Sequence, residues 1–343
     1  CCTFNKKGEW GKLCGIEAHT EKTKFLSYDA IEKQQKPIGE GTYGTVYSGK
    51  YKGTPVAIKV YKTFREDNDA EAQLFAKFDS PYIVRFYGVC YSMNALVLEY
   101  CEFGSVEHCY NKPEMTNEVK VLICYDFARA IKYLHDNSHI HRDLKPDNLL
   151  MSSFSHDPNI PRAKLSDFGT GKVSFKQEKN GDVQGTPAFI APEVLSGTFD
   201  KKCDVYSFGM SMWSIFAEKQ PYEDGTLCNC QSEQEYYQMI CQGVRPTLIP
   251  ECPLNCLITK CWDTEQDNRP DFAEIVEEME RIIGITKETP NETQHQEDNE
   301  QDKEETQNET MIDLSKTKEE YVITDSTDKT EQLPNVSTDG CDV

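Results

Sequence analysis

Three short segments of this chain carry side chains that could handle a triphosphate and its metal ions. Residues 39–46 are glycine-rich, residues 141–148 read His-Arg-Asp-Leu-Lys-Pro-Asp-Asn, and residues 167–169 read Asp-Phe-Gly. Glycines let backbone N–H groups approach phosphate oxygens, because no Cβ intervenes. The second segment offers a carboxylate base, a cation and an amide, and the third offers a carboxylate for a divalent metal. In this order the three segments indicate transfer of a phosphoryl group.

A glycine-rich run also opens the helix of dinucleotide-binding folds, so the residues that follow it decide its interpretation. Residues 45–48 and 54–60 are rich in β-branched and aromatic side chains, with turn residues between them. This pattern predicts two strands joined by a turn rather than a helix. We therefore expect the glycines to lie in a hairpin that covers a nucleotide.

Lys59 ends the apolar run Val56-Ala57-Ile58, and an unpaired buried ammonium is costly, so the side chain needs anions nearby. One anion would be nucleotide phosphate. The apolar spacing over residues 69–78 predicts a helix that carries Glu71. Taken alone, Glu71 reads as a solvated helix carboxylate, but its spacing from Lys59 favours an ion pair. At ~4 Å and an effective dielectric of ~20, such a pair is worth about 4 kcal/mol before desolvation.

The ordered set of motifs resembles a eukaryotic protein kinase. The resemblance implies an α+β, two-lobed fold, with an antiparallel sheet and a helix in the small N-terminal lobe and a larger, mainly helical C-terminal lobe. It covers roughly residues 31–283. We expect the small lobe over about 31–98, the hinge at 99–104 and the large lobe over about 105–283.

The same resemblance implies ATP and Mg²⁺ as cofactors and assigns roles to individual residues. Asp143 would accept the proton of the substrate hydroxyl, and Asn148 and Asp167 would hold Mg²⁺. The catalytic set that it implies is Asp143, Lys145, Lys59, Glu71 and Thr186. The residues that it places around the nucleotide are Gly39, Gly41, Gly44, Val46, Ala57, Lys59, Leu98, Glu99, Cys101 and Leu150.

Other residues are expected to shape or regulate the domain. Glu193, in Ala191-Pro192-Glu193, is expected to pair with Arg269. Arg142, beside the base, is a candidate to bind a phosphate group on the activation segment, 167–193. The candidate phosphoacceptors are Thr170 and Ser174. The aromatic stack expected to link the lobes, anchored by Asp204, consists of Phe168, Phe75, Phe86 and His141.

Two parts of the sequence disagree about the acceptor. Lys145-Pro146 and Gly185-Thr186-Pro187 resemble serine/threonine kinases, whereas residues 204–209, Trp213 and Cys261-Trp262 resemble tyrosine kinases. The mixture resembles the tyrosine kinase-like group, whose members mostly phosphorylate Ser/Thr, so we expect protein Ser/Thr hydroxyls as acceptors, with Tyr left open. The alternative is a pseudokinase that acts as an ATP-binding scaffold. Its usual mark is loss of a catalytic motif residue, and none is lost here.

The amino-acid composition limits which partners and which cellular compartment we expect. The chain has 343 residues, and 37 Lys+Arg against 58 Asp+Glu give a formal net charge of -21. So acidic a chain should repel nucleic acid and anionic membranes. Its 15 cysteines are scattered, which favours reduced thiols in the cytoplasm. No run approaches the roughly 18 apolar residues of a membrane span. The chain begins with Cys1-Cys2, so an upstream receptor or anchor is left open.

The two ends differ in character from the middle. Residues 1–30 show no convincing period, and we interpret them as a leader of uncertain order. Residues 284–343 hold 17 acidic side chains against 5 lysines, with few aromatics. A segment with so few apolar side chains cannot offset its ordering entropy, so we expect a disordered acidic tail.

Overall fold

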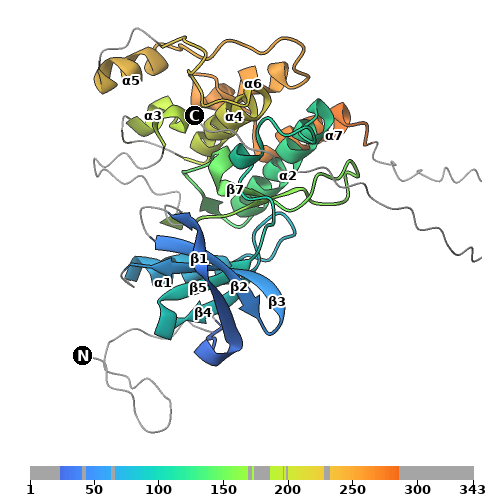
Figure 1. Ribbon diagram of the computed structural model, residues 1–343. Helices are drawn as coiled ribbons and strands as arrows, with labels where there is room; N and C mark the ends of the chain where they lie inside the picture. The colour runs from blue at the N-terminus through green and yellow to red at the C-terminus, as the bar shows by residue number, and fades with distance from the viewer. Residues whose placement is uncertain are drawn as a thin grey trace, which may run out of the picture. The chain divides into compact units, whose positions relative to one another are not determined.

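The computed structural model describes residues 24–40, 44–62, 66–168, 172–173, 186–195, 197, 200–227 and 232–285. Figure 1 shows the strands of the blue-to-teal part gathered into one sheet with helix α1, and the later part built mainly of helices. This arrangement confirms the predicted α+β fold. Gly41, Thr170, Ser174, most of the leader and the tail from residue 286 lie outside the described residues.

The sheet of the small lobe is antiparallel throughout. The hairpin predicted after the glycine-rich run is present, and Lys52 and Gly53 form its turn with φ of 50° and 83°. Two successive residues with positive φ are typical of the tight turn that matches the twist of paired strands. In hydrogen-bonded order the strands are β1 (Ile31–Glu40), β2 (Gly44–Tyr51), β3 (Thr54–Tyr61), β5 (Ala95–Glu99) and β4 (Phe86–Cys90).

The two-residue period of strand β3 sorts its side chains between two cores. Val56 and Ile58 enter a small cluster on one face of the sheet. Ala57 and Tyr61 enter the main core on the other face, together with Leu74 and other residues of helix α1 (Glu66–Lys77). Lys59 lies between Ala57 and Tyr61 in this alternation, so the sheet directs its ammonium toward the helix.

Residues 24–30, which the sequence analysis leaves in the leader, pack against the small lobe. Phe25 forms a parallel bridge with Val89, and the Leu26 N–H donates to the Val89 carbonyl at 2.8 Å. The Leu26 side chain is buried in the smaller core. The Val89 N–H in turn donates to the Lys24 carbonyl at 2.9 Å, so this segment adds two backbone hydrogen bonds at the β4 edge of the sheet.

The large lobe is built around helix α2 (Asn117–Asp136), which contacts α4 (Lys202–Ala217) and α7 (Phe272–Ile282). Helix α2 begins after Thr116, whose hydroxyl accepts from the Val119 N–H at 3.3 Å. Helix α7 begins with a reciprocal cap between Asp271 and Glu274. The shorter helices are α3 (Pro192–Leu195), α5 (Glu233–Cys241) and α6 (Asn255–Cys261).

Four short strands form two small sheets beside helix α2. Strand β6 (His139–Ile140) pairs with β9 (Lys172–Val173), and β7 (Leu149–Met151) pairs with β8 (Ala163–Leu165). The 3-10 helices are Tyr28–Ala30, Tyr91–Met93, Glu107–Cys109, Pro146–Asn148, Pro187–Phe189 and Gln266–Asn268. Across the described ranges, no helix combines the length and the apolar character that crossing a membrane requires.

Candidate active site

The ammonium of Lys59 contacts two carboxylates from distant parts of the chain. Its Nζ lies 2.8 Å from Glu71 Oε1 and 3.4 Å from Asp167 Oδ1. Burial alone would lower the pKa of Lys59, but the charges of Asp167 and Glu71 outweigh burial and hold the pKa above its ordinary value. The ion pair expected from the sequence is therefore present, and Lys59 remains charged.

Tyr61, which the sequence analysis did not single out, also contacts Glu71. Its hydroxyl donates to Glu71 Oε2, the oxygen that Lys59 does not bind. A signal for this contact was available, because residues 59 and 61 share one face of a strand. The sequence does not show, however, that the side chains of Lys59 and Tyr61 both reach the carboxylate of Glu71.

Asp143 lies at the centre of a compact polar cluster. Its Oδ1 accepts from the Thr186 hydroxyl at 3.2 Å, and its Oδ2 accepts from Asn148 Nδ2 at 3.0 Å. Lys145 Nζ lies 3.3 Å from Asp143 Oδ2 and donates to Thr186 Oγ1 at 2.6 Å. The side chains of Thr186, Asn148 and Lys145 thus all contact Asp143, the residue assigned as the base.

Asn148 and Asp167 are brought together by the backbone. The Ser166 N–H donates to the Asn148 carbonyl at 2.8 Å, which places Asp167 one residue from that contact. Asn148 Nδ2 also donates to the Asp143 carbonyl at 2.8 Å, and within the described part of the chain no donor contacts Asn148 Oδ1. An amide oxygen and a half-exposed carboxylate are hard oxygen donors, so they fit Mg²⁺.

Two residues of this region have a left-handed backbone. Arg142 has a φ of 69° and Asp167 a φ of 60°. Non-glycine residues adopt this conformation rarely, and surrounding contacts must hold them in it. For Arg142 the contact is visible, because its N–H donates to Asp204 Oδ1 at 2.8 Å.

Asp204 anchors the catalytic loop from helix α4. Its carboxylate accepts from the N–H of His141 at 2.9 Å and from His135 Nε2 at 2.9 Å, besides the Arg142 N–H. Burial of Asp204 acts to raise its pKa, but the hydrogen bond and charge of His135 outweigh that effect and leave the pKa lowered. A fully buried carboxylate is thus satisfied by three donors.

The expected aromatic stack is continuous across both lobes. Ring centroids are 6.0 Å apart for Phe86 and Phe75, 4.7 Å for Phe75 and Phe168, and 5.5 Å for Phe168 and His141. His139, which the sequence analysis did not assign, lies 6.1 Å from Phe168. Phe168 therefore packs between helix α1 and the catalytic loop.

Apolar residues form the walls expected around the purine. Ala57 pairs with Leu98 across strands β3 and β5, and both side chains are buried. Val46 and Leu150 are partly buried against the same core. Gly44 has a structural reason of its own, since a Cβ there would collide with the Val60 carbonyl. A Cβ at Gly39 would meet only the Val46 Cβ, at 4.0 Å, which is an ordinary van der Waals contact.

The hinge residues differ in how many of their polar groups have a hydrogen-bond partner. The Glu99 N–H donates to the Arg85 carbonyl at 2.8 Å, and its carboxylate accepts from Lys164 Nζ at 2.6 Å. The Cys101 carbonyl accepts from the Gly104 N–H at 3.3 Å, while its own N–H has no acceptor among the described residues. The Cys101 N–H is thus a hinge donor available to a ligand.

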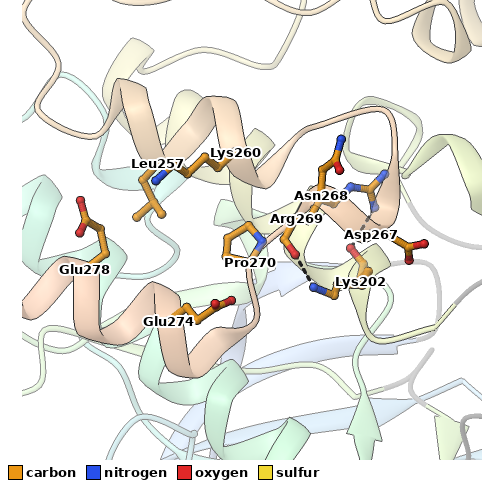
Figure 2. A pocket seen from close by; sticks show the side chains of 9 residues that line it. All are labelled: Lys202, Leu257, Lys260, Asp267, Asn268, Arg269, Pro270, Glu274 and Glu278. Carbon is orange, nitrogen blue, oxygen red and sulfur yellow. Dashed lines mark hydrogen bonds between the residues drawn. The ribbon is translucent and has the colours of Figure 1, made fainter.

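Glu193 and Arg269 form the bidentate pair expected from the sequence, at 2.6 and 2.9 Å. Arg269 Nη1 also donates to the Lys202 carbonyl at 3.0 Å, and Lys202 Nζ donates back to the Arg269 carbonyl (Figure 2). Beside these two hydrogen bonds lies a polar pocket of about 460 Å³. It is lined by residues of α6, of α7 and of the segment that joins them, together with Lys202. It contains none of the residues assigned to ATP or to the base.

Comparison with known proteins agrees with this geometry. The sequence pattern of the family described as "Protein tyrosine and serine/threonine kinase" matches residues 32–279. The chain is 34% identical to the dual specificity protein kinase shkA of Dictyostelium discoideum, over 72% of this chain and 48% of that protein. It is 33% identical to the serine/threonine-protein kinase STY46 of Arabidopsis thaliana, over 71% of this chain and 43% of that protein.

A further relative, the probable serine/threonine-protein kinase gdt2 of Dictyostelium discoideum, is 29% identical over 82% of this chain and 17% of that protein. The chain thus spans less than half the length of each of these relatives. The shared part coincides with the two-lobed region and includes the Lys59, Asp143 and Asp167 motifs. On this match, the chain belongs to the protein tyrosine and serine/threonine kinase family.

Proposed function

We propose that this chain is an ATP-dependent protein kinase that transfers the γ-phosphoryl group to Ser and Thr hydroxyls of protein substrates, with Tyr as a second acceptor. The observation that carries the proposal is the contact of Lys59 with Asp167, 108 residues later, beside the cluster around Asp143. It brings the phosphate cation and the metal carboxylate together. Relatives named as serine/threonine and dual specificity kinases support the choice of acceptors.

The described side chains account for the main requirements of phosphoryl transfer. Lys59 would bind phosphate oxygens, and Glu71 would keep its ammonium in place. Asn148 and Asp167 would hold Mg²⁺, which would neutralise charge on the phosphates. The Cys101 N–H and the Glu99 carbonyl would face the adenine edge, between the walls formed by Val46, Ala57, Leu98 and Leu150.

Asp143 would take the proton of the acceptor hydroxyl. Its Oδ1 is held by the Thr186 hydroxyl, and its Oδ2 by Asn148 and Lys145, so the carboxylate is oriented before substrate arrives. Lys145 would stabilise charge on the transferring group, since its ammonium lies beside the base. Thr186 belongs to the loop that resembles serine/threonine kinases, which supports a small hydroxyl as the main acceptor.

The domain boundaries and the compartment belong to the same proposal. We assign the kinase domain to residues 31–283, with the acidic tail after it and a leader, 1–30, before it, of which residues 24–30 pack against the small lobe. Protein substrates, rather than nucleic acid, suit the net charge of -21. The nine cysteines within the described ranges are all free, which suits a reducing, cytoplasmic setting where ATP is available.

A single experiment tests the proposal. The chain is incubated with labelled ATP, Mg²⁺ and a library of Ser, Thr and Tyr peptides, beside Asp143→Asn. We expect turnover of order 1–100 s⁻¹ on a good peptide and a severe loss in the variant. Equal signals from both proteins would refute Asp143 as the base. Phosphotyrosine as the sole product would overturn the acceptor class, and nucleotide binding without turnover would favour the pseudokinase scaffold.

A further inference from the structure

Tyr61 is a buried tyrosine whose hydroxyl and ring both lie against the Lys59–Glu71 pair. The residue is 3% exposed and ends strand β3, two positions after Lys59 on the same face. Its hydroxyl donates to Glu71 Oε2, and Lys59 Nζ lies 5.4 Å from its ring centroid. Its backbone N–H donates to the Asn94 carbonyl at 2.9 Å, which fixes the end of the strand.

The two oxygens of Glu71 are divided between two residues of one strand. Oε1 accepts from Lys59 and Oε2 accepts from Tyr61. Glu71 is only 4% exposed, so water cannot replace a lost donor without local opening. A buried carboxylate oxygen left without a donor is costly, and hydrogen bonds to charged groups are among the stronger ones.

We expect the two contacts to respond differently to nucleotide. Lys59 is already shared between Glu71 and Asp167, and bound phosphate would take part of its three-donor capacity. The Tyr61 hydroxyl has a single O–H donor, and Glu71 Oε2 accepts it. Burial and the Glu71 charge both raise the pKa of Tyr61, so its hydroxyl keeps its proton and stays a donor.

We propose that Tyr61 is a positioning residue that holds Glu71, and with it helix α1, in the engaged position whether or not nucleotide is bound. It acts through Glu71 and does not touch the reacting atoms. The structural part stands on the contacts above, and the kinetic part rests on the proposed kinase function. The small lobe would then be organised for Lys59 before ATP arrives, which reduces the ordering required on binding.

The test removes the hydroxyl alone. Tyr61→Phe keeps the ring in the core, and Tyr222→Phe is the matched control. Tyr222 is also a buried tyrosine, with a hydroxyl that donates to the Val244 carbonyl at 3.3 Å in the large lobe. Amide hydrogen exchange is measured on the full chain without nucleotide. We expect exchange in helix α1 to rise about tenfold in Tyr61→Phe and to stay within twofold in the control.

Kinetics and a double-mutant cycle then separate positioning from general loosening. We expect kcat/KM for ATP to fall about tenfold in Tyr61→Phe, for the loss of one hydrogen bond to a charged group. In a Glu71→Met background, which has no acceptor of that length, the same change should alter exchange in α1 by less than twofold. The proposal would be overturned if Tyr61→Phe raised exchange in helix α1 equally in the natural chain and in the Glu71→Met background. Unchanged exchange in Tyr61→Phe alone would overturn it too.

A second variant keeps the test decisive if Tyr61→Phe does not fold. Glu71→Asp shortens the carboxylate by one methylene, so it should not reach both donors, and exchange in helix α1 should rise as well. Unchanged exchange there would also overturn the proposal. The two hypotheses fail separately, because absence of turnover in the natural chain refutes the kinase function, whereas unchanged exchange refutes the role of Tyr61.

Discussion

Lys59 and Asp167 are in contact although 108 residues separate them, with Nζ 3.4 Å from Oδ1. The strand that carries Lys59 belongs to the small lobe, and Asp167 follows strand β8 of the large lobe. The contact therefore crosses between the two halves of the fold. Since it joins the cation assigned to phosphate with the carboxylate assigned to metal, it gives the most direct test of the site.

The first prediction concerns the shape of the cation at residue 59. Lys59→Arg keeps the positive charge but replaces a compact ammonium by a planar guanidinium, which cannot contact Glu71 and Asp167 in the same way. We expect kcat/KM to fall at least ~100-fold, as when an electrostatic donor is removed from an active site. The exposed neighbour Lys62 provides the control, and Lys62→Arg should leave turnover within twofold. Similar losses in both variants would point to a general disturbance of strand β3.

A second prediction concerns Asp204, which receives three donors from the catalytic loop and helix α2. Asp204→Asn conserves volume but turns one acceptor into an NH₂ group that faces existing donors. We expect a loss of about 3 kcal/mol in the free energy of unfolding, since buried donors lose their charged acceptor. Denaturant titration measures the loss. Stability equal to that of the natural chain would show that the loop does not depend on this carboxylate.

The sequence predicted those parts of the site that short motifs encode. The Lys59–Glu71 pair was predicted from strand and helix spacing, whereas the Glu193–Arg269 pair and the cluster around Asp143 were expected from the resemblance of their motifs to those of protein kinases. The α+β fold was expected from the resemblance to protein kinases, while strand period and helical spacing predicted the hairpin after the glycine-rich run and the helix that carries Glu71. Such signals depend on neighbours along the chain, and this is why they could be found without a structure.

Other contacts between distant parts of the chain were not predicted. The Glu99 side chain reaches Lys164 from another lobe, and His139 enters the stack on Phe168 from a two-residue strand. Neither residue carries a local pattern that indicates its partner. Gly44 shows a different limit, because close approach to Val60 explains the glycine without reference to phosphate. A motif residue can thus have a packing role that its spacing does not show.

A third prediction follows from the neutral imidazole of His139. Neither ring nitrogen has a hydrogen-bond partner among the described residues. Burial, with a smaller effect of the nearby His141, lowers the pKa of His139 to about 4. In the unfolded chain the pKa of this histidine is near ~6.5. Between about pH 4 and this value, the unfolded chain therefore binds a proton more readily than the folded chain. Stability from this residue is therefore complete above about pH 6.5 and is lost as the pH falls toward 4.

Between those two pH values the loss due to His139 should amount to about 3 kcal/mol. His139→Leu keeps an apolar side chain beside Phe78 and Phe168 and removes the titration. Urea unfolding of both proteins from pH 7 downward measures the difference. We expect the two stability curves to run parallel above pH 6.5 and to converge or cross below it, with the natural chain falling more steeply. Parallel curves over the whole range would contradict the assignment.

The last prediction compares two arginine–carboxylate pairs in the large lobe. Arg269 is buried and binds both oxygens of Glu193, whereas Arg281 is exposed and pairs with Glu278 one turn away on helix α7. Arg269→Lys replaces a two-pronged contact by a single ammonium and also removes the donor to the Lys202 carbonyl. We expect the free energy of unfolding to fall by about 3 kcal/mol, as for other broken buried pairs. Arg281→Lys should leave the denaturant midpoint unchanged, because an exposed pair is screened by water and salt. A loss of the same size in both variants would mean that burial is not what makes the Arg269 pair important to the fold.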